Sequence, residues 1–276
     1  MKKKPSRWTL TVDTPFEIDI QDFPEADVYP VTDFHHPVHL NLFLAGSMYG
    51  KLGTHFFQLE QYDLQITAPW EPHGENRIQK GLRILSINLD PDMLLGNLLE
   101  YRRKAISLFL LDPRERHRLV NAPGTKKLRM EFSSSFFDIT GEEPEILKLR
   151  RWIAIQSMFI ELLHCIRTEE LPEALYRFYQ KLSGAFGLFG NDRNINIQEA
   201  ADACSLSVSR FSHLFRQVCR MSFAEYEMRR RLSRAVMLLR QGFPAKVAAE
   251  QTGFYDASHF SRYFRLYFGI TPGKLQ

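Results

Sequence analysis

The sequence predicts an α+β protein in which an antiparallel β-domain is followed by a helical segment and an all-helical domain. Three observations carry this prediction. Apolar residues alternate along the chain between His39 and Asp90, they recur at helical spacing after Pro144, and a short helical pattern occurs twice in the last third of the chain. We therefore expect the three parts to cover residues 1–140, 141–170 and 171–276.

The first part shows the alternation and turn residues that are typical of β-strands. Leu40, Leu42 and Leu44 occupy alternate positions, which would place them on one face of a strand. Residues 46–53 begin and end with glycine and predict a turn region, and residues 64–67 predict a further strand. Together these segments indicate an antiparallel β-domain.

A long helix is predicted over residues 144–166. Pro144 suits the first position of a helix, and an apolar stripe begins at Ile146, Leu149 and Ile153. The stripe continues through Ile160 and Leu163, and the other faces carry Trp152, Ile155, Met158, Phe159 and Leu162. A helix with apolar residues on so many sides needs burial on more than one side. We expect it to pack on the β-domain and to pair with a second copy in a homodimer, with burial inside one chain as the alternative.

The last part of the chain contains a repeated helix. Residues 209–216 and 258–265 are identical at five of eight positions. In both copies apolar residues recur at helical spacing, at Phe211, Leu214, Phe215 and Val218 and again at Phe260, Tyr263, Phe264 and Tyr267. Each copy therefore predicts an amphipathic helix with a buried aromatic face and a polar face turned to solvent.

A shorter helix is predicted before each copy. Asn196 and Glu199 form a capping box that starts the first, and Ser207 caps the repeated helix that follows it. Small residues lie where the two helices of each unit must cross closely, at Ala200, Ala201, Ala245, Ala248 and Ala249. Gly253 lies at the second turn, where glycine tolerates a positive φ. The pattern predicts two helix-turn-helix units joined by a long helix over residues 223–239.

Basic residues are concentrated around this repeat. Residues 192–276 contain 13 lysines and arginines against 7 acidic residues, whereas residues 1–191 contain 23 against 25. An ordinary bundle with a solvated face would explain one such helix, but two tandem copies favour DNA binding. Arg210 and Arg262 are the candidates for guanine contacts, and Arg216 and Arg265 for phosphate contacts. The full set of predicted DNA-binding residues is Ser209, Arg210, Ser212, His213, Arg216, Gln217, Ala257, Ser258, His259, Ser261, Arg262 and Arg265.

Several motifs in this domain follow one another in a specific order. They are Ser-x-x-x-Phe-x-x-x-Phe from Ser207 to Phe215, Ser222-Phe223-x-x-Tyr226, Arg231-Leu232-x-x-Ala235, Gly253-Phe254-x-x-x-Ser258-x-Phe260-x-Arg262-x-Phe264 and Gly269-x-Thr271-Pro272. By these residues the domain resembles the AraC family of bacterial transcription regulators, although Ser205 and Arg220 stand where the family usually has glycine. The resemblance implies an activator that contacts RNA polymerase, with repression as the alternative.

Part of the β-domain resembles the cupin-type sensor domain that many AraC-family members carry. The pattern is Leu59-x-x-x-Asp63-Leu64-x-x-x-Ala68-Pro69-x-x-Pro72-His73, with Tyr62 in place of a turn glycine. The resemblance implies a β-barrel that holds one small effector. We expect a small polar effector, such as a sugar, to be bound by His36, His39, Trp70 and His73. An architectural DNA binder that needs no effector is the alternative.

The residues argue against an enzyme. Metal-dependent cupins present a His-x-His pair, a glutamate and a later histidine, whereas His35, His36 and His39 have the wrong spacing for adjacent ligands on one strand face. A DNA-repair methyltransferase with the same DNA-binding module would need a reactive-cysteine motif, and Cys204 and Cys219 lie in predicted helical segments. We therefore expect no catalytic residue, no metal and no cofactor.

Cysteine usage and hydropathy bear on the compartment. The three cysteines are an odd number without Cys-x-x-Cys spacing, so they predict neither a disulfide framework nor a zinc site. The most apolar stretch, residues 152–166, is too short to span a membrane and is interrupted by polar residues. We expect a cytoplasmic protein without a membrane partner.

Overall fold

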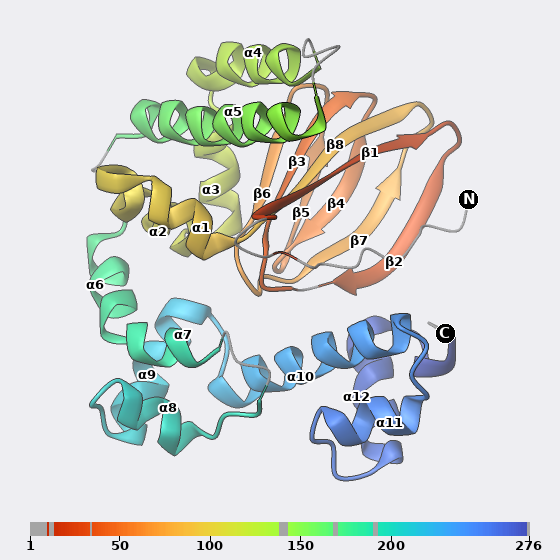
Figure 1. The fold of residues 1–276 in the computed structure, drawn as a ribbon, viewed down its shortest axis with the longest axis vertical. Helices are drawn as coiled ribbons and strands as arrows, with labels where there is room; N and C mark the ends of the chain where they lie inside the picture. The colour runs from red at the N-terminus through yellow and green to blue at the C-terminus, as the bar shows by residue number, and fades with distance from the viewer. Residues whose placement is uncertain are drawn as a thin grey trace. The chain divides into compact units, whose positions relative to one another are not determined.

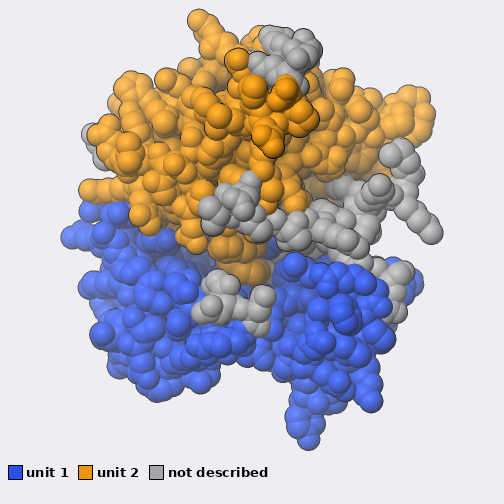
Figure 2. Space-filling model, viewed as in Figure 1, with its two compact units in different colours: residues 1–8, 31–35, 173–276 blue, residues 9–30, 36–172 orange. Residues whose placement is uncertain are grey.

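A computed structural model describes residues 10, 14–33, 35–137, 143–167, 171–189 and 193–274. It confirms the predicted α+β class, because strands occupy the chain as far as Leu89 and helices follow from Pro91 (Figure 1). Contacts divide the chain into two compact units, in which residues 9–30 and 36–172 fall in one unit and residues 31–35 and 173–276 in the other (Figure 2). The predicted divisions at residues 140 and 170 stay predictions, since both lie outside the described residues.

The β-domain consists of two four-stranded sheets. The strands are β1 (Phe16–Phe23), β2 (Asp27–Asp33), β3 (Val38–Ala45), β4 (Met48–Leu52), β5 (His55–Leu59), β6 (Leu64–Thr67), β7 (His73–Ile78) and β8 (Leu82–Leu89). One sheet has the order β1-β8-β3-β6 and the other β2-β7-β4-β5. Except at the β4–β5 hairpin, consecutive strands lie in opposite sheets, as in a double-sheet jelly roll.

Side chains of both sheets fill the core of this domain. Phe43 of β3 and Ile84 of β8 contact a cluster from the other sheet, formed by Met48, Leu59 and Ile78. Every one of these side chains is buried, so removal of apolar surface from water holds the two sheets together.

Two segments of this domain differ from the prediction. Residues 46–53, predicted as a turn region, contain the strand β4 between turns at Gly46 and Gly53, which both have positive φ. The predicted strand at residues 64–67 is confirmed as β6, but all four of its residues are buried. Helix α3 (Pro113–Val120) packs against β6, so the side chains of β6 do not alternate between core and solvent.

Helices of the first unit follow the sheets. They are α1 (Pro91–Asn97), α2 (Arg102–Leu110), α3 (Pro113–Val120), α4 (Lys126–Phe137) and α5 (Pro144–Cys165), with short 3-10 helices η1 (Leu99–Tyr101) and η2 (Pro123–Thr125). Helix α5 begins at Pro144 as predicted and packs beside α4 (Figure 1). Its buried residues are Ile155, Met158, Phe159, Leu162 and Leu163. Ile146, Leu149 and Ile153 are instead about half exposed, at 48%, 58% and 52%.

The second unit is helical. Its elements are α6 (Glu173–Lys181), α7 (Ser183–Leu188), α8 (Ile197–Ala203), α9 (Val208–Cys219), α10 (Phe223–Arg240), α11 (Ala245–Gln251), α12 (Ala257–Phe268) and η4 (Pro272–Lys274). An aromatic cluster of Phe186, Phe189, Phe211, Phe215, Phe223 and Tyr226 fills the core around α9. A membrane-spanning helix is not found among the residues that the structure describes.

Candidate DNA-binding helices and histidine cluster

The first helix-turn-helix unit is formed by α8 and α9. The side chain of Asn196 accepts a hydrogen bond from the backbone N–H of Glu199 at 2.9 Å, and Ser207 Oγ accepts one from the N–H of Arg210 at 3.3 Å. These caps satisfy backbone donors that the first turn of each helix leaves open. Ala200 and Ala201 are fully buried, as expected where two helices approach closely.

The second unit, α11 and α12, repeats this geometry. Pro244 precedes α11, and Asp256 caps α12 by accepting a hydrogen bond from the N–H of His259 at 2.6 Å. After α8 the N–H of Leu206 donates to the carbonyl oxygen of Ala201, and after α11 Phe254 N–H donates to Ala249, both at 3.0 Å. The two turns are therefore built in the same way, and both predicted units are confirmed.

The turns use residues in the left-handed backbone conformation. Gly253 has φ 76° after α11, as predicted, and Ser205 has φ 53° at the equivalent place after α8. Arg220 has φ 58° at the end of α9. Left-handed backbone is costly for residues other than glycine, so these turns impose their geometry on whichever residue stands there.

The buried faces of the repeated helices follow the prediction in α9 and depart from it in α12. In α9, Phe211, Leu214, Phe215 and Val218 are all buried. In α12, Phe260 and Phe264 are buried together with Phe268, whereas Tyr263 and Tyr267 are only half-buried. The guanidinium group of Arg262 lies over the ring of Tyr263 at 5.3 Å, and that of Arg229 lies over the ring of Tyr267 at 5.6 Å.

Most of the predicted DNA-binding residues are exposed on the opposite faces. The exposed residues are Ser209, Arg210, His213, Arg216, Gln217, Ala257, Ser258, Arg262 and Arg265. Ser212, His259 and Ser261 are half-buried. Ser212 Oγ donates to the carbonyl oxygen of Val208 at 2.7 Å, and the ring of His259 packs against that of Tyr263 at 4.7 Å. These two side chains are therefore less accessible than the sequence predicts.

Helix α10 holds the second unit through its arginines. Arg231 donates to the carbonyl oxygen of Gly253 at 3.2 Å and lies over the ring of Phe254 at 5.2 Å. Arg234 donates to the carbonyl oxygen of Gln251 at 3.4 Å. Part of the positive charge on α10 is thus engaged within the domain, which leaves the arginines of α9 and α12 as the exposed basic groups on the repeated helices.

The four predicted effector residues lie in two ring pairs. His36 and Trp70 have ring centroids 5.7 Å apart, and those of His39 and His73 are 5.4 Å apart. His39 belongs to β3 and His73 begins β7, while His36 and Trp70 lie in the connections that lead into these strands. The structure therefore brings together residues that are more than thirty positions apart in the sequence.

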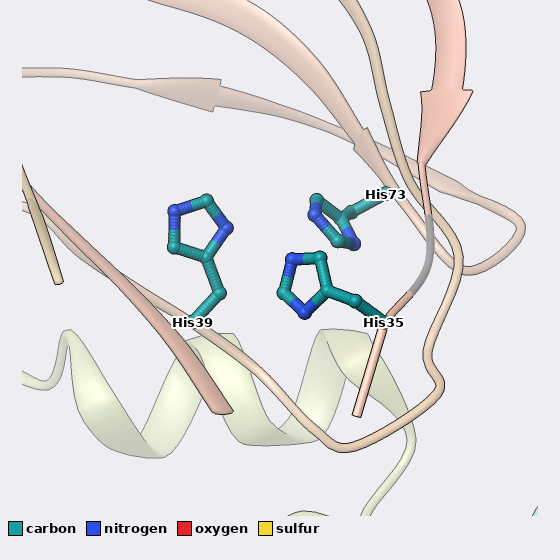
Figure 3. Close-up of side chains that lie close together, drawn as sticks. All are labelled: His35, His39 and His73. Atoms are coloured by element: carbon teal, nitrogen blue, oxygen red, sulfur yellow. The ribbon is translucent and has the colours of Figure 1, made fainter. Parts of the chain in front are cut away.

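His35 joins this group, although the sequence did not place it there. One ring nitrogen from each of His35, His39 and His73 lies within 4.8 Å of the others. Figure 3 shows the three rings close together. The spacing of the histidines does not suit adjacent ligands on one strand face, but these rings come from the β2–β3 connection, from β3 and from β7. His35 is buried, and His39 and His73 are half-buried.

The loop before β7 is fixed by Glu71. Its carboxylate forms an ion pair with Arg116 of α3, whose side chain is only 1% exposed, and accepts a hydrogen bond from the N–H of Ala68 at 3.0 Å. The carbonyl oxygen of Glu71 accepts a hydrogen bond from His73 Nδ1 at 3.0 Å. A buried ion pair is costly to break, so it holds the backbone of the loop and the ring of His73 in place.

Two cysteines in the helical domain are poor nucleophiles. Burial raises the pKa of the Cys219 thiol far above its usual value, and it also raises the pKa of Cys204. Cys204 Sγ accepts a hydrogen bond from the N–H of Ala185 at 3.3 Å. The thiolate is the reactive form, so neither residue suits methyl transfer.

Comparisons with known proteins identify relatives of the C-terminal domain. Residues 200–276 match the family model of a helix-turn-helix domain. The arabinose operon regulatory protein of Escherichia coli K12 is 32% identical over 133 residues, which are 48% of this chain and 41% of that protein. The transcriptional activator RhaR of Mannheimia succiniciproducens is 30% identical over 122 residues, 42% of this chain and 44% of its own length. The chain thus matches less than half the length of these curated relatives, which are transcription regulators.

The fold extends the likeness to nearly the whole chain. The structure of ToxT from Vibrio cholerae superimposes with a TM-score of 0.57 at 14% identity, covering 94% of this chain and 97% of ToxT. ToxT with an unsaturated fatty acid bound gives a TM-score of 0.53 at 13% identity, covering 94% of each chain. At this identity the likeness shows a common fold. The sequence matches confirm the resemblance to AraC-family regulators in the helix-turn-helix domain. For the rest of the chain, the likeness to ToxT shows the fold alone.

Proposed function

We propose that this protein is a sequence-specific transcription regulator that reads two successive major-groove segments of DNA with α9 and α12. The observation that carries the proposal is the repetition of one unit. Each unit has a short helix, a left-handed turn and an amphipathic helix that exposes arginine and serine on the face opposite its aromatic core. The relatives of the helix-turn-helix domain are regulators, which supports the same role here.

The proposed reading uses one exposed arginine of each repeated helix to contact bases. Arg210 and Arg262 suit bidentate contacts to guanine, which is the commonest specific contact of arginine in the major groove. Arg216 and Arg265 lie further along the same helices and suit phosphate contacts. Helix α10 has 18 residues and is therefore about 27 Å long, which supports a separation close to one turn of DNA, about 34 Å.

The test is to select DNA with the purified full-length protein. Random fragments are bound, washed and sequenced, and the enriched sites are then footprinted. We expect two recognised blocks whose centres are about 10 base pairs apart, one for each unit. Enrichment of fragments without a shared motif, or of a single block, would contradict reading by both units.

We infer that the protein activates transcription by contacting RNA polymerase and that it acts as a homodimer. The matched relative RhaR is an activator, and the exposed apolar residues of α5 support the dimer. Transcription in vitro, from a promoter that carries the selected site, should rise when the protein is added to RNA polymerase. A fall in transcript instead would assign repression.

We further propose that the β-domain binds a small effector beside His36, His39, Trp70 and His73. Imidazole and indole rings support a polar ligand held by stacking and hydrogen bonds, such as a sugar. The structure of ToxT with a fatty acid makes an apolar acid the competing class. The ligand must bind one domain arrangement more tightly than another, because equal affinity for both shifts nothing.

Calorimetry with a panel of sugars and fatty acids separates these two classes. A promoter reporter then tests the site with Trp70→Ala, which removes an indole ring without touching the three clustered histidines. We expect Trp70→Ala to lose the effector response while the purified variant still binds the selected DNA. A full response would remove Trp70 from the effector site.

A further inference from the structure

We propose that His35, His39 and His73 bind one divalent transition-metal ion of the zinc class through one imidazole nitrogen each. The site goes beyond the proposed effector response and stands whether or not that response exists, because metal binding is measured directly. Three histidine ligands leave a coordination position for water or for an oxygen donor of a bound molecule.

The geometry is close to that of a three-histidine site. The three nitrogens lie within 4.8 Å of one another. Zinc–nitrogen bonds of about 2.1 Å at tetrahedral angles would place them about 3.4 Å apart, so each pair has to close by at most about 1.4 Å. Rotation of the rings about their side-chain bonds supplies shifts of this size. The three rings already lie close together (Figure 3).

Hydrogen bonds on the outer side of two rings orient them for this role. A carbonyl oxygen only accepts, so His73 Nδ1, 3.0 Å from the carbonyl oxygen of Glu71, must carry the proton. The lone pair of His73 is then on Nε2. His39 Nε2 lies 2.8 Å from Ser86 Oγ, which directs Nδ1 of that ring toward the cluster. Metal-bound histidines characteristically donate their second ring nitrogen to such partners.

The outer hydrogen-bond partners of His73 and His39 are themselves held in place by other residues of the first unit. The carbonyl oxygen that fixes His73 belongs to Glu71, whose carboxylate is paired with the buried Arg116. Arg116 also donates to the carbonyl oxygen of Phe109 at 2.9 Å. Ser86 is itself buried in β8. Both outer partners are thus held by surrounding structure, which limits the rearrangement that metal binding requires.

The donor set selects the class of metal. All three donors are neutral imidazoles, which suit zinc, copper, nickel and iron, whereas magnesium and calcium prefer oxygen ligands. A half-buried site strengthens this preference, because the ion exchanges part of its hydration shell for nitrogen donors. We therefore expect binding of Zn²⁺ and Co²⁺ and none of Mg²⁺.

The experiment is a titration of the full-length protein after treatment with a chelator. Calorimetry with ZnCl₂ should give one site per chain, and Co²⁺ should give the visible absorption of a nitrogen-bound ion, with no heat from MgCl₂. Loss of an outer hydrogen-bond partner typically weakens metal binding about 10–100-fold. His39→Gln and His73→Gln each remove a ligand and should weaken zinc binding by more than this. His164→Gln changes an exposed histidine of α5 outside the cluster and should bind zinc as the wild type does.

Ser86→Ala provides a variant that keeps all three rings. It removes only the outer partner of His39 and should weaken zinc binding about 10–100-fold. Circular dichroism checks that each variant is folded. If a histidine variant is unfolded, zinc binding by Ser86→Ala and the Co²⁺ spectrum of the wild type test the proposal instead. A wild type that binds no zinc would overturn the proposal. So would unchanged zinc affinity in folded His39→Gln and His73→Gln. If these two variants are unfolded, unchanged zinc affinity in Ser86→Ala would overturn it.

Discussion

Three residues adopt the left-handed backbone conformation at positions where glycine is usual. Tyr62, Ser205 and Arg220 have φ values of 68°, 53° and 58°. Each of these departures was visible in the sequence, and in each case the turn keeps its geometry. A residue with a Cβ pays about 1–2 kcal/mol for this conformation, so the cost is local and the rest of the domain sustains it.

Ser205→Gly should therefore stabilise the protein by about 1 kcal/mol, since relief of the strained backbone is partly offset by the greater freedom of glycine in the unfolded chain. Ser205→Ala is the matched control, because alanine keeps the Cβ and removes only the hydroxyl. Urea unfolding monitored by circular dichroism compares the three proteins. A glycine variant no more stable than the alanine variant would show that this turn stores no strain.

His117 should make stability depend on pH. Burial lowers its pKa, more strongly than the carboxylate of Asp63 raises it, and Arg129 lowers it further. The amide of Asn121 lies 3.0 Å from His117 Nδ1, and the ring packs on Phe57 at 4.8 Å, which are contacts suited to a neutral imidazole. The unfolded chain then binds the proton more readily than the folded one. The contribution of His117 to the free energy of unfolding is complete above about pH 6.5, the pKa of an unfolded histidine. It falls as the pH drops toward the lower pKa of His117 in the folded state.

The measurement is the free energy of unfolding at pH 7.5 and at pH 5.5, for the wild type and for His117→Gln, which has no titratable group at this position. The wild type should lose more stability on acidification, by at most about 1.4 kcal/mol per pH unit for one proton. Other histidines contribute equally to both proteins and cancel in the comparison. An identical loss in both would mean that His117 titrates normally.

At the scale of single elements, the helices were predicted more completely than the strands. A capping bond such as Ser207 to Arg210 spans three residues, so the sequence contains the whole interaction. Strand β4 was missed because the glycines beside its ends resemble the ends of one turn. Of its two pairing partners, β5 follows directly in the chain but β7 is distant. His35 was missed for the same reason, since its nearness to His73 depends on how two loops meet.

The contact between α7 and α8 gives a test of close packing. A Cβ on Gly184 would lie 2.0 Å from the carbonyl oxygen of Ala203, whereas a Cβ on Gly187 in the same helix would meet nothing within 4 Å. Gly184→Ala should therefore destabilise the helical domain by about 1–3 kcal/mol. Gly187→Ala should stabilise it by about 0.5–1 kcal/mol, because alanine is the better helix former. Thermal unfolding measures the stability of both variants. Equal changes in stability would mean that α7 can shift on α8 to make room for the added methyl group.

The repeated helices give the test of base reading. Arg210→Ala and Arg262→Ala should each weaken binding to the selected site by about 1–3 kcal/mol and relax base preference in different blocks of that site. Lys246→Ala is the control, because it removes an exposed charge of α11 and should weaken binding to all sequences alike. Competition binding with single-base variants of the site separates the two effects. Uniform weakening by both arginine variants would assign them to the phosphate backbone.

At the scale of the whole molecule, the fold class and the order of its parts were predicted from local patterns, whereas assembly depends on surfaces that a single chain leaves open. Helix α5 shows this. The sequence indicated apolar residues on several of its sides, and the structure distinguishes them: Phe159 and Leu162 are fully buried, while Leu149 and Ile153 are exposed. Apolar residues gathered on one exposed helix face are a common mark of a protein interface.

We predict that this face forms the homodimer. Leu149→Glu and Ile153→Glu together should shift sedimentation from dimer to monomer, because burying two carboxylates in an apolar interface is costly. Leu266→Glu is the control, since Leu266 of α12 is 73% exposed and lies outside α5. A wild type that sediments as a monomer at micromolar concentration would refute the dimer, and a double variant that remains dimeric would move the interface elsewhere. Dimerisation brings a second pair of reading helices to the same DNA at high effective concentration, so the monomeric variant should also bind a two-copy site more weakly while keeping its affinity for a single copy.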